Sequence, residues 1–409
     1  MRGEWRDKTI GELTENFDSI RVPVKGPDRR SGPYPYYGAS GIVDYVDRYL
    51  FDGEYLLVAE DGENLRTRKT PVAFLANGKF WVNNHAHIIR GNREADTRFL
   101  MYALTRSDIS GFLTGSTMPK LTQGNLNRIP ILTPSIDEQR AIAHILGTLD
   151  DKIELNRRTN ETLEAMARTL FKSWFVDFDP VRARSEGRAS ALPKSFADKF
   201  PSSFENSDLG EIPSGWRACS LYSIADVIYG APFSSAKFNP DGIGDPLIRI
   251  RDLPDESPGV WTTEIHPKGY KVHSGDIVVG MDGEFRAYLW GGADAWLNQR
   301  VCVFAPKPGY SSAFVRNSII GLLAHVEASE TATTVIHLGK NDIDRFMVVD
   351  PTKDVLAAYN RIAQPLYDRI VVAKNEARTL VELRDALLPR LILGEFRIDN
   401  PERFVERLQ

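Results

Sequence analysis

Two stretches of this chain repeat one pattern. Residues Thr117–Leu146 read TMPKLTQGNLNRIPILTPSIDEQRAIAHIL, and residues Thr334–Ala363 read TVIHLGKNDIDRFMVVDPTKDVLAAYNRIA. In each stretch a polar segment leads into a short apolar run, a proline ends that run, and a long helical pattern begins. Four positions match at a constant offset of 217, namely Leu121 with Leu338, Ile131 with Val348, Pro134 with Pro351 and Ile145 with Ile362. A repeat at about half the chain length predicts a duplicated domain rather than a solenoid.

Three further pairs of segments extend the repeat along the chain. The first pair is GEWRDKTIGEL with SGWRACSLYSI, which aligns Trp5 with Trp216. The second pair is GEYLLVAEDGE, which begins at Gly53, with GDIVVGMDGEF, which begins at Gly275. The third pair is WVNNHAHII, which begins at Trp81, with WLNQRVCVF, which begins at Trp296. The offsets of these pairs are 211, 222 and 215. Because the offset varies, we expect the strands to correspond while the loops between them differ in length.

The composition is that of a globular protein with more than one domain. The chain has 409 residues, of which 42% are hydrophobic and 26% are charged. It has no apolar run near the ~20 residues of a membrane helix, and the N-terminus has no signal-peptide core. Cys219 and Cys302 are interpreted as reduced thiols, so we expect a cytoplasmic protein. The net charge of -4 argues against indiscriminate nucleic-acid binding but is compatible with a local basic surface.

Each copy is predicted to begin with about 130 residues of β-rich α/β structure and to end in a long helix. Short apolar runs are separated by Gly, Asn and Asp turns, and one helix is expected over Asp96–Ser110 with a counterpart over Ser311–Ala328. The first long helix should begin at Ser135, where Ser135 and Glu138 form a capping-box pattern. It should run for about 40 residues, or roughly 60 Å.

Both long helices carry heptad seams. In the first helix the seam positions are Ile142, Leu149, Asn156, Leu163 and Leu170, with Leu146, Ile153, Asn160, Ala167 and Trp174. In the second helix they are Tyr359, Leu366, Ala373, Leu380 and Leu387, with Ala363, Ile370, Ala377, Arg384 and Leu391. This spacing predicts that the helices pair, although each seam could instead pack on its own domain. Pro389 should end or kink the second helix.

No enzyme motif stands out. The chain lacks the glycine-rich cofactor loop and (N/D)-P-P-(Y/F) segment of a methyltransferase, and it lacks a G-x-x-x-x-G-K-(S/T) phosphate loop. Asp150-Asp151-Lys152 fits a nuclease D-x-K pattern but lies within the predicted long helix. His85 and His87 lie two apart on a strand and are interpreted as one surface and one core residue rather than metal ligands. The sequence therefore favours a binding protein without catalytic or metal residues.

Two stretches, each between a predicted β-rich domain and a long helix, resemble the specificity (S) subunits of type I restriction-modification systems. They are GSTMPKLTQGNLNRIPILTPSIDEQRAIAHIL in the first copy and TATTVIHLGKNDIDRFMVVDP in the second. The second copy is the weaker match, because TKDVL replaces EQR after its proline. The resemblance implies an α+β fold of two β-rich target recognition domains, joined and spaced by two long antiparallel coiled-coil helices with pseudo-twofold symmetry. The expected parts are recognition domains at 1–135 and 213–351, a central helix at 136–180, an extended linker at 181–212, and a C-terminal helix and tail at 352–409.

The resemblance also implies the partners. Each recognition domain would read one half of a bipartite double-stranded DNA target, and the helices would dock two methyltransferase (M) subunits. Restriction (R) subunits would join through M, and no membrane is involved. The chain itself would do no chemistry and bind no cofactor, while S-adenosylmethionine, ATP and Mg²⁺ would be used on the partner subunits.

Polar loops next to the predicted strands supply the candidate DNA contacts, since direct readout needs Arg, Lys, Asn and Gln at base edges and hydroxyls or cations at phosphates. In the first copy the candidates are Arg29, Arg30, Asn64, Arg66, Arg68, Lys69, Ser116, Thr117 and Lys120. In the second copy they are Ser234, Ser235, Lys237, Arg286, Thr333, Thr334, His337 and Lys340. Each could instead be a solvated turn residue, and the likeness of EDGE to MDGE could mark a shared structural turn.

These loops differ between the copies, so an asymmetric target is expected. In the helix seams, Asn156 and Asn160 should face Ala373 and Ala377 and fix the register of the pair. Two alternatives stay open. The chain could be a scaffold that assembles partners through its helices without binding DNA, or a recognition module detached from a single-chain restriction enzyme.

Overall fold

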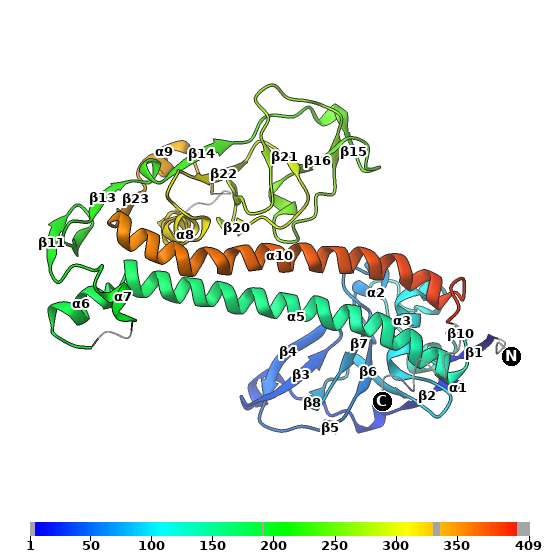
Figure 1. The fold of residues 1–409 in the computed structure, drawn as a ribbon. Coiled ribbons are helices and arrows are strands. Elements are labelled where there is room, and N and C mark those ends of the chain that lie inside the picture. Colours follow the sequence, from blue (N-terminus) through cyan, green and yellow to red (C-terminus); the bar gives the residue numbers. More distant parts are fainter. Residues whose placement is uncertain (1–4, 190–191, 330–335, 399–409) are drawn as a thin grey trace. The chain divides into compact units, whose positions relative to one another are not determined.

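The structure is a computed structural model that describes residues 5–189, 192–329 and 336–398 (Figure 1). The chain forms two compact units. Unit 1 contains residues 1–152 and 380–409, and unit 2 contains residues 153–379. Each long helix contributes residues to both units, so the two units are described separately.

Unit 1 contains small sheets and short helices ahead of the first long helix. Its strands are β1 (Arg6–Thr9), β2 (Thr14–Asn16), β3 (Tyr34–Gly38), β4 (Gly41–Val46), β5 (Phe51–Asp52), β6 (Tyr55–Ala59), β7 (Ala73–Ala76), β8 (Lys79–Val82), β9 (Ala86–Gly91) and β10 (Pro130–Thr133). Its short helices are α1 (Ile10–Leu13), α2 (Asn64–Thr67), α3 (Thr97–Arg106) and α4 (Gln123–Leu126). The sheet orders are β2-β9-β6-β7 and β4-β3-β8-β5, and β1 pairs with β10.

Unit 2 repeats this plan with its own strands. They are β11 (Phe204–Ser207), β12 (Gly210–Pro213), β13 (Arg217–Ser220), β14 (Ala225–Tyr229), β15 (Phe238–Asn239), β16 (Asp245–Ile248), β17 (Trp261–Thr262), β18 (Lys271–Val272), β19 (Ile277–Gly280), β20 (Ala287–Leu289), β21 (Ala295–Leu297), β22 (Val301–Pro306) and β23 (Met347–Asp350). Its short helices are α6 (Asp179–Ser185), α7 (Lys194–Ala197), α8 (Ser312–Ser329) and α9 (Lys340–Asp344).

The sheet topology confirms the internal repeat. The order β14-β22-β19-β20 in unit 2 matches β2-β9-β6-β7 in unit 1, and the pair β13-β23 matches β1-β10. The ladders also correct one offset. Val58 pairs with His87, and Val279 pairs with Cys302, so this strand corresponds at an offset of 221 rather than 222. The sequence match aligns the glycines that precede the two strands, Gly53 and Gly275. The hydrogen bonding of the strands instead aligns residues that are one position different from that match.

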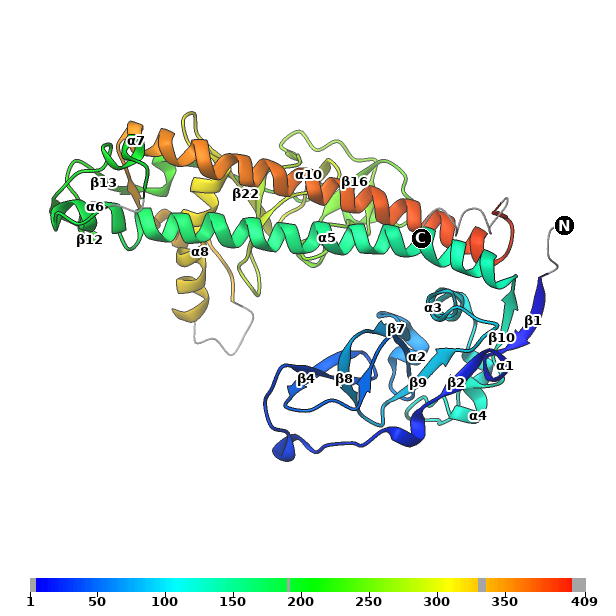
Figure 2. The ribbon, with the colours of Figure 1, turned by 60° about the horizontal axis from the view of Figure 1, so that its bottom comes forward.

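The predicted short helices are present in both copies. The helix α3 begins after Asp96, whose carboxylate accepts hydrogen bonds from the backbone N–H groups of Arg98 and Phe99. This helix packs on β6, β7 and β9 of its sheet (Figure 2). Its counterpart α8 packs on β20 and β22. The corresponding sheets β2-β9-β6-β7 and β14-β22-β19-β20 are therefore each covered by one of these helices.

The first long helix has the predicted length, and the second has the same number of residues. The helix α5 (Ile136–Phe175) has 40 residues and begins where Ser135 Oγ accepts a hydrogen bond from the Glu138 backbone N–H at 3.3 Å. The helix α10 (Lys353–Ile392) also has 40 residues. It continues through Pro389 to Ile392, so this proline lies in the last turn and does not stop the helix at its own position. The Leu393 backbone N–H donates to the Pro389 carbonyl, which extends the terminal turn.

Burial follows the predicted seams, because none of the twenty seam residues is exposed. In unit 2, Asn156 bonds to Glu376 while Phe175 contacts Tyr359, so α5 and α10 run antiparallel there. In unit 1, Asp150 bonds to Arg384, and residues of both helices share the apolar core formed by Ile142, Leu146, Leu388, Leu391 and Ile392 among others. The seams therefore pack against each other within each unit.

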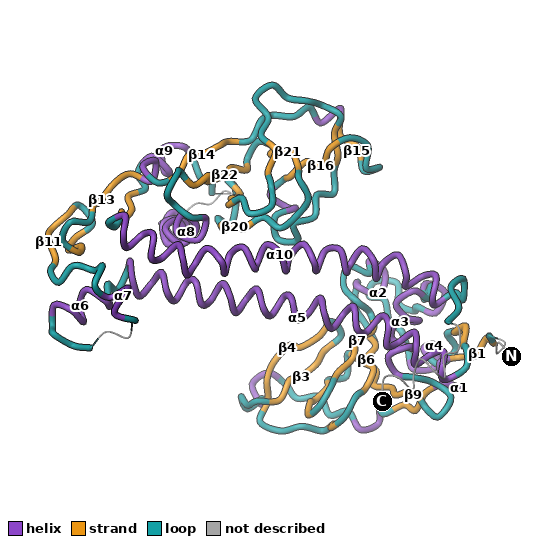
Figure 3. Tube along the Cα trace, viewed as in Figure 1, coloured by secondary structure: helices purple, strands orange, loops and turns teal. Residues whose placement is uncertain are grey.

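The segment 181–212 differs from the expected extended linker. It contains part of α6, the helix α7, and the hairpin of β11 with β12 (Figure 3). Phe200 is 2% exposed and meets Trp174 of α5 edge-on, with ring centroids 4.9 Å apart. The few large apolar residues of this polar segment anchor it to the core, a contribution that its overall composition does not reveal.

In the described part of the chain, none of the helices combines the length and the apolarity that a bilayer-spanning segment needs.

Replacing Phe200 by alanine tests this anchoring. We expect Phe200→Ala to destabilise unit 2 by about 3–5 kcal/mol, since a fully buried aromatic side chain is lost. Urea unfolding of the full chain, followed by hydrogen exchange of α5 and α10, would measure the loss. The matched control is Lys199→Ala at the neighbouring exposed position. An unchanged unfolding curve for Phe200→Ala would mean that the segment is a free linker.

Candidate nucleic-acid interface

In each copy a tight turn after a central strand holds the polar loop that precedes α4 or α9. In unit 1 the turn follows β6. The Glu60 N–H donates to the His85 carbonyl at 2.9 Å, the Gly62 N–H to the Pro119 carbonyl at 3.1 Å, and the Leu121 N–H to the Glu60 carbonyl at 2.8 Å. These bonds join the end of β6, the start of β9 and the loop 114–120.

Unit 2 contains the same three hydrogen bonds at the corresponding residues. The Met281 N–H donates to the Arg300 carbonyl at 2.8 Å, the Gly283 N–H to the Ile336 carbonyl at 3.0 Å, and the Leu338 N–H to the Met281 carbonyl at 2.8 Å. Gly62 and Gly283 both have positive φ, at 109° and 81°, a conformation that glycine adopts readily. The likeness of EDGE to MDGE is therefore explained by a shared structural turn.

An aspartate in this turn holds a basic side chain in both copies. In unit 1, His85 Nδ1 lies 2.8 Å from Asp61 Oδ2. In unit 2, His337 Nδ1 lies 2.7 Å from Asp282 Oδ1, and Arg300 Nη1 lies 3.6 Å from the same oxygen. A carboxylate only accepts hydrogen bonds, so the ring nitrogen is the donor in each pair. The two aspartates occupy one structural position but hold different partners.

Unit 1 adds a buried charge network beneath its turn. His87 is 1% exposed, and its two ring nitrogens face Asp18 Oδ2 at 2.5 Å and the Leu121 carbonyl at 2.7 Å. Each ring nitrogen therefore faces a hydrogen-bond acceptor. Arg21 binds Glu60 at 2.7 Å, and Lys120 Nζ lies 3.2 Å from Glu60. The network ties Lys120 to the core of unit 1.

These contacts lower the pKa of two carboxyl groups. Burial alone would raise the pKa of Asp18, but the hydrogen bond and charge of His87 bring it below its ordinary value of 3.8. Burial also acts to raise the pKa of Glu60, and the hydrogen bonds of Arg21 and Lys120 with the charge of His87 bring it below 4.5. Both groups therefore stay ionised and hold the surrounding cations in place.

Unit 2 replaces the members of this network at β19 and β22 with apolar residues. Met281 corresponds to Glu60 and is 8% exposed, and Cys302 corresponds to His87 and is fully buried. Burial raises the pKa of the Cys302 thiol to about 12, so it stays protonated. The two copies share a backbone arrangement while the chemistry beneath the turn has changed.

Four residues of EDGENLRTRK are candidate DNA contacts, and three of them make hydrogen bonds to the backbone of unit 1. Asn64 exchanges two hydrogen bonds of 3.0 Å with the backbone of Thr70. Arg68 donates to the carbonyls of Thr105 and Ser107 at the end of α3. Arg66 donates to the carbonyls of Gly115 and Ser116 at 3.1 and 3.3 Å and so braces the loop 114–120. The segment forms the helix α2 rather than a loop, and Lys69 is exposed.

The other candidates of unit 1 fall into two groups. Ser116 and Thr117 are exposed in the loop 114–120, and Arg30 is exposed near β3. Arg29 is partly buried, where it donates to Asp44 at 3.1 Å and lies over the ring of Tyr36. Ser116, Thr117 and Arg30 remain candidate DNA contacts, whereas Arg29 stabilises the β3–β4 hairpin.

The candidates of unit 2 are more dispersed. Ser234, Ser235 and Lys237 are exposed, and Lys237 Nζ lies 3.4 Å from Glu264. Lys340 pairs with Asp344 at 2.9 Å along α9. Two further candidates, Thr333 and Thr334, lie outside the described residues.

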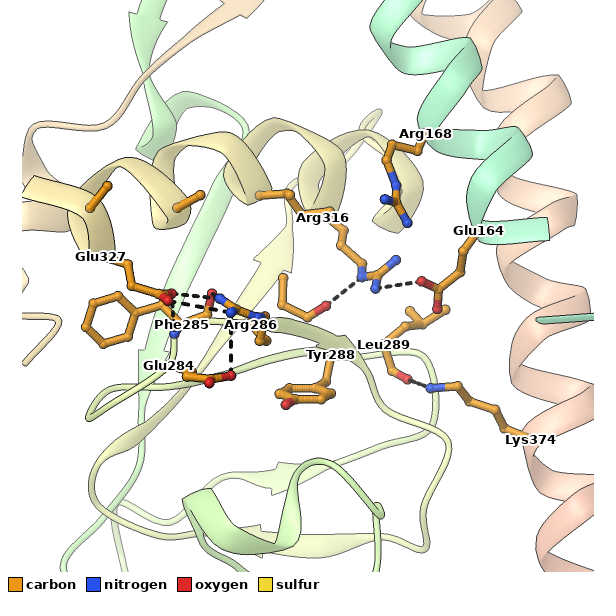
Figure 4. A pocket seen from close by; sticks show the side chains of 14 residues that line it. Glu164, Arg168, Glu284, Phe285, Arg286, Tyr288, Leu289, Arg316, Glu327 and Lys374 are labelled. Carbon is orange, nitrogen blue, oxygen red and sulfur yellow. Dashed lines mark hydrogen bonds and ion pairs between the residues drawn. The ribbon is translucent and has the colours of Figure 1, made fainter. Parts of the chain in front are cut away.

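Arg286 lines a cavity of about 890 Å³ that α5, α8, α10 and β20 surround (Figure 4). Its guanidinium lies 2.7 Å from Glu327 and 3.4 Å from Glu284. Deeper in the cavity, Arg316 donates to the Ala287 carbonyl at 2.7 Å and to Glu164 of α5 at 3.1 Å. Arg286 thus faces carboxylates of its own unit.

The predicted register residues lie at one level of the helix pair in unit 2. Asn156 is 2% exposed, and its Nδ2 donates to Glu376 Oε2 at 3.0 Å. Ala373 is fully buried, and Ala377 follows Glu376 directly. The side-chain oxygen of Asn160 is buried and has no protein partner in the described part of the chain. The sequence did not identify Glu376 as the partner of Asn156.

Sequence reasoning missed His85 and Arg300 as members of the interface. Both stand immediately before the corresponding strands β9 and β22, with side chains 51% and 57% exposed. The signal was available in the aligned segments WVNNHAHII and WLNQRVCVF, where the two residues occupy the same position. The sequence interpretation assigns His85 and His87 as one surface and one core residue, and a residue that changes type between the copies does not stand out in a repeat.

Comparisons with known proteins match the duplicated β-rich domains and their long helices to one class of protein, the specificity subunits of type I restriction enzymes. The family model described as "Type I restriction modification DNA specificity domain" matches residues 2–165. The chain is 25% identical over 425 residues to the type I restriction enzyme MjaIX specificity subunit of Methanocaldococcus jannaschii, covering 97% of this chain and 94% of that protein. The chain is therefore similar to type I restriction-modification specificity subunits along nearly its whole length.

Two further comparisons agree with this assignment. A putative type I specificity subunit of Haemophilus influenzae, S.HindORF215P, is 41% identical over 150 residues, covering 36% of this chain and 37% of that protein. Among solved structures, the S subunit from M. genitalium superposes with a TM-score of 0.58 at 16% identity, covering 95% of this chain and 96% of that one. The similarity to this solved structure supports the fold of the chain.

The charge network predicts an acid-sensitive unit 1. Because the folded pKa values of Asp18 and Glu60 lie below their ordinary values, the folded state binds fewer protons than the unfolded state. The stabilisation is complete above pH 4.5 and is lost as the pH falls through the lowered values. We expect Glu60→Gln to reduce this pH dependence, measured by hydrogen exchange of β6 and β9 in the full chain. Glu15→Gln, at an exposed position, is the control, and an equal effect of both variants would contradict the assignment.

Proposed function

We propose that this chain is the non-catalytic DNA-reading subunit of a type I restriction-modification complex and that each recognition domain reads one half of a bipartite, asymmetric target. The observation that carries the proposal is the duplicated turn. The same three backbone hydrogen bonds recur in both units around Asp61 and Asp282, while the side chains around them differ. Two domains that share a backbone turn but carry different polar side chains around it are suited to bind two different DNA sequences.

The helices support the second part of the proposal, which concerns assembly. The helices α5 and α10 present apolar side chains beyond the seam, such as Leu155 and Met166, which are 56% and 52% exposed, and Val372, which is 53% exposed. Exposed apolar side chains on long helices suit contacts with partner proteins. We propose that two M subunits dock on the helices and that R subunits join through M. S-adenosylmethionine, ATP and Mg²⁺ would then be used on those partners.

A scaffold that binds no DNA is the alternative, and one observation favours it. Several candidate readers are held by carboxylates of the same unit, including Arg286, Lys340 and Lys120. Mobility-shift assays with the purified S–M complex separate the two functions. Sequence-specific retention of duplex DNA supports the reader, and S–M assembly without any retention supports the scaffold. Methylome sequencing of cells that carry the system would then identify the two half-sites.

Exchange of one recognition domain tests modular readout. We expect that replacing residues 1–135 by the matching domain of a relative changes one half of the methylated site and leaves the other half intact, because each unit has its own turn and loops. Methylome sequencing measures the result. As the control, replacing residues 213–351 should change the other half instead. A change in both halves after either exchange would show that the readers are not independent.

The buried asparagines test how the helix register is fixed. We expect Asn156→Leu with Asn160→Leu to loosen the preferred spacer length or to overpack the seam, since a polar seam residue specifies register at a cost in stability. A slip of one heptad would shift each helix by roughly 10 Å. Spacer preference is measured by methylation of duplexes with lengthened or shortened spacers. Thr169→Ala, at an exposed position of α5, is the control. Unchanged stability and spacer preference in the double variant would assign the asparagines another role.

A further inference from the structure

The duplicated turn places one exposed side chain at the same position in both units. His85 precedes β9 and Arg300 precedes β22, and their backbone carbonyls accept hydrogen bonds from the backbone N–H groups of Glu60 and Met281. Their side chains are 51% and 57% exposed. Both carry N–H donors, which suit hydrogen-bond acceptors on DNA.

The aspartates fix how these two side chains are presented. Asp61 lies 2.8 and 3.0 Å from His85 Nδ1, so this nitrogen is occupied and Nε2 is left for another partner. In unit 2, His337 Nδ1 lies 2.7 Å from Asp282 and 3.2 Å from Arg300 Nη1. The ring nitrogen cannot donate to the carboxylate and accept from Arg300 at once. The shorter contact with Asp282 prevails, and the Arg300 guanidinium keeps its hydrogen-bond donors for a ligand.

The backbone of Arg300 supports the same interpretation. Its φ is 71°, in the left-handed region that residues other than glycine seldom adopt. Such a conformation costs on the order of 1–3 kcal/mol and is commonly kept where it places a functional side chain. The carbonyl of Arg300 is held by Met281, and its side chain lies beside Asp282 and His337. These contacts hold the left-handed conformation in unit 2, whereas the corresponding His85 of unit 1 does not have a positive φ.

We propose that His85 and Arg300 are equivalent base-reading residues, each contacting one base pair in its own half-site, with Asp61 and Asp282 as the positioning residues. This inference rests on the proposed function. An arginine held in this way suits the two acceptors of a guanine edge, and a histidine that offers Nε2 suits a single base-edge contact. The two side chains differ although their scaffolds agree, which gives the two half-sites different readouts.

The test uses the intact S–M complex and duplexes in which every base pair of the two half-sites is replaced in turn. For Arg300→Ala, we expect discrimination at one base pair of the second half-site to fall by about tenfold to a hundredfold, with the first half-site unaffected. For His85→Ala, we expect a smaller loss confined to the first half-site. Arg251→Ala and Arg48→Ala are exposed controls in units 2 and 1 and should leave discrimination unchanged.

A second measurement leaves the protein chain intact. A 7-deaza purine at the base pair assigned to Arg300 removes one acceptor of the base edge. It should weaken binding by the wild-type complex and have no further effect on Arg300→Ala. Equal weakening of both proteins overturns the contact, as does a loss in Arg300→Ala that is uniform over all base pairs, since that is the behaviour of a phosphate contact.

The outcomes also separate this inference from the function on which it rests. A wild-type complex that binds no specific duplex overturns the proposed function. A wild-type complex that reads its target while both variants discriminate as it does overturns the assignment of His85 and Arg300 alone. Asp282→Asn should reproduce part of the Arg300→Ala effect, because the guanidinium stays but loses its carboxylate. No effect of Asp282→Asn on discrimination would overturn its positioning role.

Discussion

The apolar seam between α5 and α10 is the interaction on which the rest of the structure depends. Long helices gain most of their stability from packing of an apolar face rather than from intrinsic propensity. In unit 2 that packing is aromatic, since Phe171, Phe175 and Trp174 all contact Tyr359. In unit 1 it is aliphatic, formed by leucine and isoleucine side chains of both helices. Each recognition domain is then fastened to the seam that its own unit contains.

In both units a short helix of the recognition domain is joined to a long helix by a hydrogen bond at corresponding positions, although the residue types differ. In unit 1, the hydroxyl of Tyr102 on α3 donates to Asp150 at 2.6 Å, and Arg384 of α10 binds the same carboxylate at 2.9 Å. In unit 2, Asn317 on α8 donates to the hydroxyl of Tyr367 at 3.1 Å. Tyr367 corresponds to Asp150 at the repeat offset of 217. The aromatic ring is thus on the short helix in unit 1 and on the long helix in unit 2. Each junction contains a hydrogen-bonded pair, which is partly buried in unit 1 and buried in unit 2.

The duplicated turn shows how two readers can diverge on one scaffold. Backbone hydrogen bonds and a glycine of positive φ define the turn, and neither depends on the neighbouring side chains. The residues beneath it were therefore free to differ. Unit 1 has the polar residues Glu60 and His87 at these positions, whereas unit 2 has Met281 and Cys302. Buried charges need several partners at once, so the whole network of unit 1 is present or absent together.

The sequence by itself determined the duplicated architecture, the two 40-residue helices and the cap at Ser135, because periodicity and capping are local properties of the chain. The sequence did not reveal that the segment 181–212 packs on the rest of unit 2. That packing depends on single buried rings such as Phe200, which the composition of the segment does not indicate. The roles of the polar loop residues were also beyond its reach. Arg66, Arg68 and Arg286 fit the composition of DNA readers, yet the fold brings carbonyls and carboxylates of their own unit within reach. Only the tertiary structure decides which cations are satisfied internally, because those partners lie about 40 residues or more away along the chain.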